Sequence, residues 1–228
     1  MFFLDHLDFD INKENILGID ETGVGDYFTP VISCAALLPI EMHQWAKQLG
    51  VKDSKLLSQS KINEIASILK TKIPHVIYTL SQSGYNKLTN KKFNANEIKF
   101  FIHSQSIINF DKKFNINSKK IIIDKYSTIN SINKYKDKFS FINEFNDIYN
   151  KYNQITFIEK AETISLSVAC ASILARAHLN KIMEVQRNEW DFDFLLGASS
   201  KVKEQIKEFE QKFGSDSLEK VAKTSFKL

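Results

Sequence analysis

The stretch ILGIDETGVGDYFTP, residues 16–30, joins an apolar run to two adjacent carboxylates, Asp20 and Glu21, and then to a glycine-flanked turn. Three of the seven glycines of the chain lie inside it. A second apolar run, VISCAALL (31–38), follows directly after Pro30. Short apolar runs bounded by glycine, proline and acids are typical of strands, so we expect two strands joined by a loop.

The rest of the chain alternates helical and extended patterns. Apolar residues recur at helical spacing in four segments, at 58–70, 94–110, 165–187 and 202–213. Asn94 or Asn96 is expected to cap the second of these helices. Short apolar segments predict further strands at 75–81, 119–127 and 154–162, and the three isoleucines of the second indicate burial on both faces of a sheet. Because strands and helices intermix, the fold class is α/β or α+β.

The composition is that of an ordinary globular protein, since 43% of the 228 residues are hydrophobic and 25% are charged. This length favours one large domain over two. No run of about 18 apolar residues occurs, so no membrane span is expected. Residues 1–15 lack the basic region and the long apolar stretch of a secretory signal. Cys34 and Cys170 lie in apolar, small-residue stretches, which indicates two buried thiols in a reduced cytoplasm.

The net charge of +4, from 31 basic and 27 acidic residues, is compatible with a polyanionic partner but does not establish one. Arg176 and Arg187 are the only arginines, and all other basic residues in this count are lysines. Abundant Lys, Asn and Ile are also typical of an AT-rich genome. The lysine runs therefore do not by themselves indicate nucleic-acid binding.

Carboxylates at the ends of apolar runs are the clearest chemical signal in the chain. Asp20 ends one such run, Asp124 follows three isoleucines, and Glu162 follows a further apolar segment. Burying an unpaired carboxylate is costly, so lysines, backbone amides or a metal ion must compensate. Clusters of carboxylates without His or Cys favour Mg²⁺ or Mn²⁺ over Zn²⁺, and the five histidines are scattered away from these acids.

The adjacent acids raise a geometric question, because successive side chains of a strand point to opposite faces. Asp20 and Glu21 can reach one ion only if the strand ends there and the chain bends, and Gly23 and Gly25 make such a bend possible. Ordinary strand-end acids at a turn explain the same spacing equally well. The turn has no Walker or G-x-G-x-x-G pattern, so its bare backbone indicates either close approach to a sugar-phosphate chain or a hairpin without a ligand.

Five segments stand in a fixed order: GIDETGVGDYFTPVISCAALL (18–38), GVKDSKLLS (50–58), IIIDKY (121–126), EKAETISLSVACASILARA (159–177) and LLGASSKVKEQIKEF (195–209). They resemble the motifs of the type 2 ribonucleases H, and most closely those of the ribonuclease HIII subgroup. That subgroup reads Asp-Glu-x-Gly-x-Gly-Asp-Tyr-Phe-x-Pro in its first motif. The ribonuclease HII subgroup has an arginine where this chain has Val24, and an aspartate where this chain has Glu162.

The resemblance implies an α/β protein of RNase H-like fold, with a mixed five-stranded sheet flanked by helices and a helical C-terminal part. Residues 1–228 would form a single type 2 ribonuclease H catalytic domain, in which 1–15 are a short N-terminal extension. The implied activity is endonucleolytic cleavage of the RNA strand of RNA–DNA hybrids, which leaves 5′-phosphate and 3′-hydroxyl ends. From the sequence as a whole we expect a cytoplasmic monomer, without a membrane or an obligate protein partner.

Carried over by motif, the catalytic and metal-binding acids are Asp20, Glu21, Asp124 and Glu162. The resemblance implies two ions of Mg²⁺ or Mn²⁺ with substrate bound, one activating the attacking water and the other stabilising the leaving 3′ oxygen. Metal ions rather than lysines are then expected to satisfy Asp20 and Glu21. Four carboxylates would repel each other and the phosphates without metal, so the metal-free protein is expected to be inactive.

The resemblance also implies substrate contacts. Lys55 and Lys160 match family positions near the scissile phosphate, although ordinary solvated lysines would look the same in the sequence. Gly23, Val24 and Gly25 would present main-chain groups to the minor groove and its 2′-hydroxyls.

The chain departs from the pattern at its start, because ribonuclease HIII enzymes typically carry an N-terminal substrate-binding domain and only fifteen residues precede Ile16. We expect lysine-rich helices to supply the contacts to the hybrid instead, and we expect hybrid binding to weaken steeply as the salt concentration rises. One alternative is ribonuclease HII-like incision at single ribonucleotides in DNA, against which Val24 and Glu162 argue. Another is a non-catalytic nucleic-acid-binding protein, which the presence of all four acids disfavours.

Overall fold

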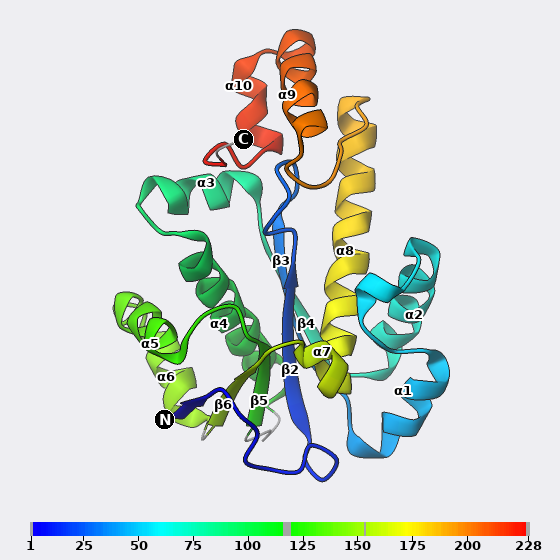
Figure 1. Ribbon diagram of the computed structural model, residues 1–228, viewed down its shortest axis with the longest axis vertical. Coiled ribbons are helices and arrows are strands. Elements are labelled where there is room, and N and C mark those ends of the chain that lie inside the picture. The colour runs from blue at the N-terminus through cyan, green and yellow to red at the C-terminus, as the bar shows by residue number, and fades with distance from the viewer. Residues whose placement is uncertain (1, 116–119, 153, 227–228) are drawn as a thin grey trace.

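A mixed six-stranded sheet forms the centre of the protein (Figure 1). The computed structural model describes residues 2–115, 120–152 and 154–226. Along the sheet the strands are ordered β1 (Phe2–Leu4), β6 (Gln154–Ile158), β5 (Lys120–Asp124), β2 (Ile16–Thr22), β3 (Val31–Leu37) and β4 (His75–Leu80). The β2–β3 and β3–β4 pairs are antiparallel, and the other neighbours run parallel.

The helices surround this sheet and also build the end of the molecule that holds the C-terminus (Figure 1). They are α1 (His43–Leu49), α2 (Gln59–Lys72), α3 (Gln82–Asn90), α4 (Ala95–Phe114), α5 (Ile129–Lys138), α6 (Asn143–Lys151), α7 (Ala161–Ile164), α8 (Leu166–Trp190), α9 (Ser200–Phe213) and α10 (Ser215–Val221). Two single turns of 3₁₀ helix, η1 (Ile40–Met42) and η2 (Ser54–Leu56), precede α1 and α2.

The seven other segments with helical or extended patterns each contain an element of the predicted type, and the predicted strand pair around the glycine turn is β2 and β3. Asn94 caps α4 through a reciprocal capping box with Glu97. The predicted 119–127 strand is β5, whose three isoleucines are all buried, and residue 119 lies outside the described residues. The helices α1, α3, α5, α6 and α10 were not predicted from the sequence.

Two expectations need correction. The sheet has a sixth strand, β1, which lies within the supposed N-terminal extension and pairs with β6 because Phe3 packs edge-on against Tyr149 and Phe157. The predicted 154–162 strand is too long, since β6 ends at Ile158 and the chain turns into α7. Lys160 makes this turn with a left-handed φ of 55°. Glu162 therefore sits on a helical turn rather than on a strand.

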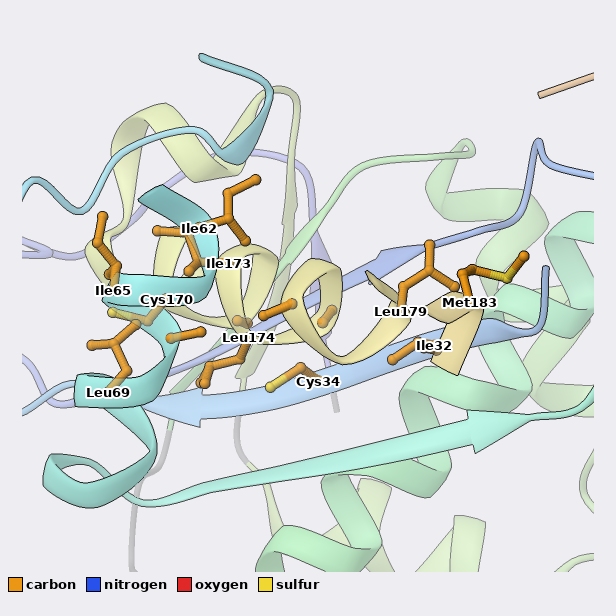
Figure 2. Packing of buried hydrophobic residues seen from close by; sticks show 14 of the residues in the cluster. Ile32, Cys34, Ile62, Ile65, Leu69, Cys170, Ile173, Leu174, Leu179 and Met183 are labelled. Atoms are coloured by element: carbon orange, nitrogen blue, oxygen red, sulfur yellow. The ribbon is translucent and has the colours of Figure 1, made fainter. Parts of the chain in front are cut away.

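Helix α8 covers one face of the sheet and is itself covered by α2, as Figure 2 shows for the side chains between β3 and α2. Gly18 of β2 makes this close packing possible, because a Cβ atom there would lie 2.3 Å from the backbone nitrogen of Val168. The predicted buried thiols are confirmed, since Cys34 of β3 and Cys170 of α8 are both buried and free. A second cluster of buried residues, rich in aromatic rings, lies under α4, α5 and α6 on the other face.

The parallel strands bring the predicted acids together. Strands β2, β5 and β6 run in the same direction, so their carboxyl ends meet at one edge of the sheet. In register, Ile19 is opposite Ile123, which places Asp20 and Asp124 at the ends of neighbouring strands. The turn after β6 then carries Glu162 to the same edge.

Candidate active site

A cleft of about 510 Å³ opens at this edge of the sheet, and all four predicted acids line it. Asp20 and Glu21 come from the end of β2, Asp124 is the last residue of β5, and Glu162 lies in α7. Residues more than a hundred positions apart in the chain are therefore gathered at one surface. This is the set of acids that the resemblance to the type 2 ribonucleases H implies, and the spacing of the acids alone left it open.

The two adjacent acids of β2 face different neighbours. The strand does not end at Glu21, because β2 stays paired with β3 through Thr22. Burial raises the pKa of Asp20 well above its usual range, and the neighbouring Glu21 charge adds to this, while a hydrogen bond with Ser172 of α8 works in the opposite direction. Asp20 also accepts a hydrogen bond of 2.8 Å from the backbone N–H of Glu21.

Glu21 is held from the opposite side of the sheet, by helix α4. Its carboxylate lies 2.8 Å from Nζ of Lys99 and 2.9 Å from Nε2 of His103. Burial works to raise the pKa of Glu21, but the hydrogen bond with His103 and the Lys99 charge outweigh it and lower this pKa. The expectation that metal ions rather than lysines satisfy both acids is therefore wrong for Glu21, which the protein itself supplies with a lysine.

Asp124 and Glu162 form the other side of the acidic cluster. Asp124 accepts a hydrogen bond of 3.0 Å from the backbone N–H of Ala161, which ties the start of α7 to the end of β5. Burial raises the pKa of Asp124, and the nearby Glu162 charge adds to it. Oε1 of Glu162 lies 3.5 Å from Nζ of Lys55, whereas its Oε2 is buried and has no hydrogen-bond partner among the described residues.

The predicted substrate-binding residues divide into two groups. Lys55, Gly23 and Val24 line the cleft. Gly25 and Lys160 are both exposed and are not among the described residues that line it. Lys55 stands at the mouth with a side chain that is 78% exposed, so its ammonium is free to meet a ligand as well as Glu162.

Gly23 and Gly25 differ in whether the fold has room for a side chain at their positions. Gly23 has a φ of 86°, and a Cβ atom there would lie 2.2 Å from the carbonyl oxygen of Pro30. The fold itself therefore requires this glycine. Gly25 is exposed, and a Cβ atom there would meet nothing within 4 Å. Packing therefore gives no reason for the second glycine.

Further residues of the cleft were missed from the sequence. Lys99 and His103 stand four positions apart on the predicted 94–110 helix, which places both side chains on the same face of that helix. This spacing could have identified them as a pair from the sequence. Arg176 lines the cleft from α8, and its guanidinium lies 3.4 Å from Oγ1 of Thr22. It is one of only two arginines in the chain, but nothing in the sequence pattern pairs it with the glycine turn.

The chemistry of the lining fits a hard divalent cation. The four carboxylates offer only oxygen ligands, which suit Mg²⁺ or Mn²⁺. The unpartnered Oε2 of Glu162, and the burial that raises the pKa of Asp20 and of Asp124, indicate that the protein alone does not fully stabilise these carboxylates as anions. In the part of the chain that the structure describes, no three His, Cys, Asp or Glu side chains stand close enough together to form a metal-binding group by themselves.

Comparisons with known proteins place the chain in a family. The family model described as ribonuclease HII matches residues 17–228. Ribonuclease HIII of Oceanobacillus iheyensis is 35% identical over 93% of this chain and 67% of its own length. Ribonuclease HIII of Phytoplasma mali is 34% identical over 92% of this chain and 70% of its own length.

Solved structures agree with this. The crystal structure of Bst-RNase HIII in complex with Mn²⁺ has a TM-score of 0.85 at 28% identity, over 93% of this chain and 67% of that one. Aquifex aeolicus RNase H3 shares the fold at 24% identity with a TM-score of 0.73, over 95% of this chain and 74% of that one. The chain belongs to the type 2 ribonucleases H and, within them, to the ribonuclease HIII family.

Membership settles the predicted class of protein. The chain is an enzyme, a nuclease of the ribonuclease H kind. The predicted RNase H-like fold is confirmed, with six strands in place of five. Over the described residues, no helix is both long and apolar enough to cross a membrane.

Proposed function

We propose that this protein cleaves the RNA strand of RNA–DNA hybrids endonucleolytically, with divalent cations, and leaves 5′-phosphate and 3′-hydroxyl ends. The observation that carries the proposal is the single cleft lined by Asp20, Glu21, Asp124 and Glu162. Uncompensated negative charge at the closed end of this cleft would repel a phosphodiester unless cations were present. The relative whose structure contains Mn²⁺ supports a divalent ion in this role.

The four acids would share the binding of two Mg²⁺ or Mn²⁺ ions when substrate is bound. Such ions lower the pKa of an attacking water and stabilise the charge on the leaving oxygen. Among the described residues, Asp20 and Asp124 form no ion pair with a lysine and Glu162 has one only at 3.5 Å, so these three acids are the ligands most available to a cation. Glu21 is oriented by His103 and Lys99, and this fixes the direction of its carboxylate before any ion arrives.

The residues around the acids would bind the hybrid. Lys55 at the mouth of the cleft supplies a mobile cation for phosphate oxygens, and the exposed Lys160 supplies another beside α7. Val24 and Gly25 would bring the backbone of the turn against the RNA strand. Because all four acids come from one chain, the proposed site is complete without a second copy.

The two cysteines bear on the cellular compartment in which the protein acts. Both cysteines are free and buried, and burial raises the pKa of the Cys170 thiol to about 12. Unpaired, unreactive thiols fit a reducing environment, so we propose that the protein acts in the cytoplasm.

The test uses three labelled duplexes of one sequence: an RNA–DNA hybrid, a DNA duplex with one ribonucleotide, and all-DNA. We expect cleavage of the hybrid with Mg²⁺ or Mn²⁺, none with a chelator, and product ends that a polymerase extends directly. Asp124→Asn should abolish cleavage and retain binding of the hybrid. Preferred cleavage of the single-ribonucleotide duplex would identify a ribonuclease HII-like activity instead. Full cleavage by Asp124→Asn in Mg²⁺ would contradict the assignment of the acids.

A further inference from the structure

One lysine near the end of the chain lies entirely inside the protein. The Lys223 side chain is 0% exposed, and its Nζ donates hydrogen bonds to the carbonyl oxygens of Gly23 and, at 2.9 Å, of Thr29. Its ammonium also lies 5.6 Å from the centre of the Tyr85 ring and 5.4 Å from that of Phe226. Burial lowers the pKa of this lysine to about 7. A buried ammonium is expensive to maintain, so its contacts call for a functional explanation.

The hydrogen bonds of Lys223 all go to the glycine turn of the cleft. The Gly23 carbonyl accepts from Lys223, from Oγ1 of Thr29 at 3.1 Å and from the backbone N–H of Asp26 at 3.3 Å. Three donors on one oxygen fix the direction in which the carbonyl of Gly23 points, which is inward. Because a trans peptide is planar, the N–H of Val24 then points the opposite way.

The peptide between Gly23 and Val24 also lies at the wall of the cleft. Gly23 and Val24 both line the cleft, whereas Lys223 is enclosed behind them and does not appear among the described residues of its wall. Among the residues that the structure describes, none accepts a hydrogen bond from the Val24 N–H. The peptide between Gly23 and Val24 therefore offers the cleft an unused donor.

Lys223 is itself anchored to a part of the protein outside the turn. Its backbone N–H donates to the Tyr27 carbonyl of the turn itself at 2.9 Å, but its two neighbours in the chain are held by Asn86 of α3. On either side of it, the Ala222 carbonyl accepts from the Asn86 side chain at 2.9 Å, and the Thr224 N–H donates to that side chain at 3.0 Å. Figure 1 shows the C-terminal end of the chain beside α3, at the end of the molecule where β2 turns into β3. The backbone that carries Lys223 is therefore held by α3, and its ammonium reaches the turn from there.

We propose that Lys223 is a positioning residue that sets the Gly23–Val24 peptide so that the Val24 N–H donates to an oxygen of the RNA strand. The acceptor class is a ribose 2′-hydroxyl or an adjoining phosphate oxygen, and only the former separates RNA from DNA. This inference rests on the proposed function, because it names how the same cleft recognises its substrate. The carboxylates stand on β2, β5 and α7, which Lys223 does not contact among the described residues.

The test compares Lys223→Met, which keeps the length of the side chain and removes the ammonium, with Lys220→Met. Lys220 is exposed in the last turn of α10, so its variant controls for the loss of one positive charge close by. The readouts are the ¹⁵N–¹H signal of Val24 without substrate, KM and kcat for the labelled hybrid, and the Kd values for the hybrid and for all-DNA duplex in an Asp124→Asn background.

For Lys223→Met we expect a shifted Val24 amide signal, a KM for the hybrid about tenfold higher and a kcat within about threefold of wild type. The Kd for all-DNA duplex should stay within about twofold, so discrimination between the duplexes falls. Lys220→Met should leave the Val24 signal, and the ratio of the two Kd values, as in wild type. Equal weakening of both duplexes, or a loss confined to kcat, would identify a general structural effect and overturn the proposal.

A milder variant covers the case in which Lys223→Met does not fold. Thr29→Val removes the hydroxyl that donates to the Gly23 carbonyl and accepts from Lys223 at 3.4 Å, but it keeps the bonds of Lys223 to the carbonyls of Gly23 and Thr29. We expect the same changes in the Val24 signal and in KM, at a smaller size of about threefold. An unchanged Val24 signal in a folded variant refutes the orientation, whether or not the wild type cleaves hybrids. Absence of hybrid cleavage by the wild type refutes the proposed function separately.

Discussion

Exchanging Gly23 for alanine should destabilise the whole protein, whereas the same exchange at Gly25 should not. At Gly23 the left-handed backbone, with a φ of 86°, costs a residue with a side chain about 1–2 kcal/mol. A Cβ atom at 2.2 Å from the Pro30 oxygen must in addition move the backbone, and such overpacking costs about 1–3 kcal/mol. The free energy of unfolding should therefore fall by about 2–5 kcal/mol in Gly23→Ala.

Gly25→Ala is the matched control, because its new methyl group enters open space. Its free energy of unfolding should stay within about 0.5 kcal/mol of wild type. Because the proposed function brings the backbone at this position against the RNA strand, the KM for hybrid should rise about tenfold. Separate effects on stability and on KM would show that the two glycines serve the fold and the substrate respectively.

The assay is urea denaturation followed by far-ultraviolet circular dichroism, without metal ions, and KM measurement on the labelled hybrid for folded variants. A Gly23→Ala protein as stable as wild type would refute the reasoning from the Pro30 contact. A Gly25→Ala protein with wild-type KM would refute the close approach of RNA at this residue. Loss of more than about 2 kcal/mol in Gly25→Ala would contradict the open space described around it.

Three further predictions concern charge. Lys99→Met should lower the free energy of unfolding by about 1–3 kcal/mol in denaturation without metal, because it removes the 2.8 Å partner of Glu21 and leaves only His103; an unchanged midpoint would show that the pair contributes nothing. The lowered pKa of Lys223, about 7, means that the unfolded chain binds more protons above that pH. Wild type should therefore gain on the order of 3 kcal/mol relative to Lys223→Met between about pH 7 and pH 9.5, and a constant difference in urea titrations would contradict this. Hybrid affinity should fall steeply between about 50 and about 200 mM salt if phosphate contacts by lysines dominate, and a flat response would exclude that dependence.

The carboxylates of the cleft differ in how far the protein itself compensates their charge. Glu21 is paired with Lys99 and His103 of α4 before any ligand arrives, whereas Glu162 keeps a buried oxygen without a hydrogen-bond partner among the described residues. The protein therefore stabilises one carboxylate for orientation and leaves the others available. Because uncompensated buried charge opposes folding, divalent ions that bind there should also raise the stability of the folded chain.

Local patterns predicted a large part of the fold because they report burial on one face of an element. The isoleucine run of β5 and the apolar spacing of α2 and α9 are of this kind. The patterns failed for α3, α5 and α6, which are rich in Asn and Lys and carry few apolar residues each. These helices are stabilised by one to three buried side chains each, such as Tyr85, Ile132 and Phe145, and their burial depends on the completed core.

The sequence alone predicted the class of the protein, which the comparisons confirm, and it named the four acids that line the cleft. Ordered motifs and carboxylates at the ends of apolar runs are local features, and the parallel strands bring them to one edge as expected. The charged partners of the cleft residues, by contrast, depend on the tertiary structure. His103 reaches Glu21 across 82 positions and Lys223 reaches Gly23 across 200, and in the sequence that lysine looks like any other in a lysine-rich chain. Burial distinguishes Lys223 from the other lysines. Whether a lysine is buried depends on which distant segments pack together rather than on its neighbours in the sequence.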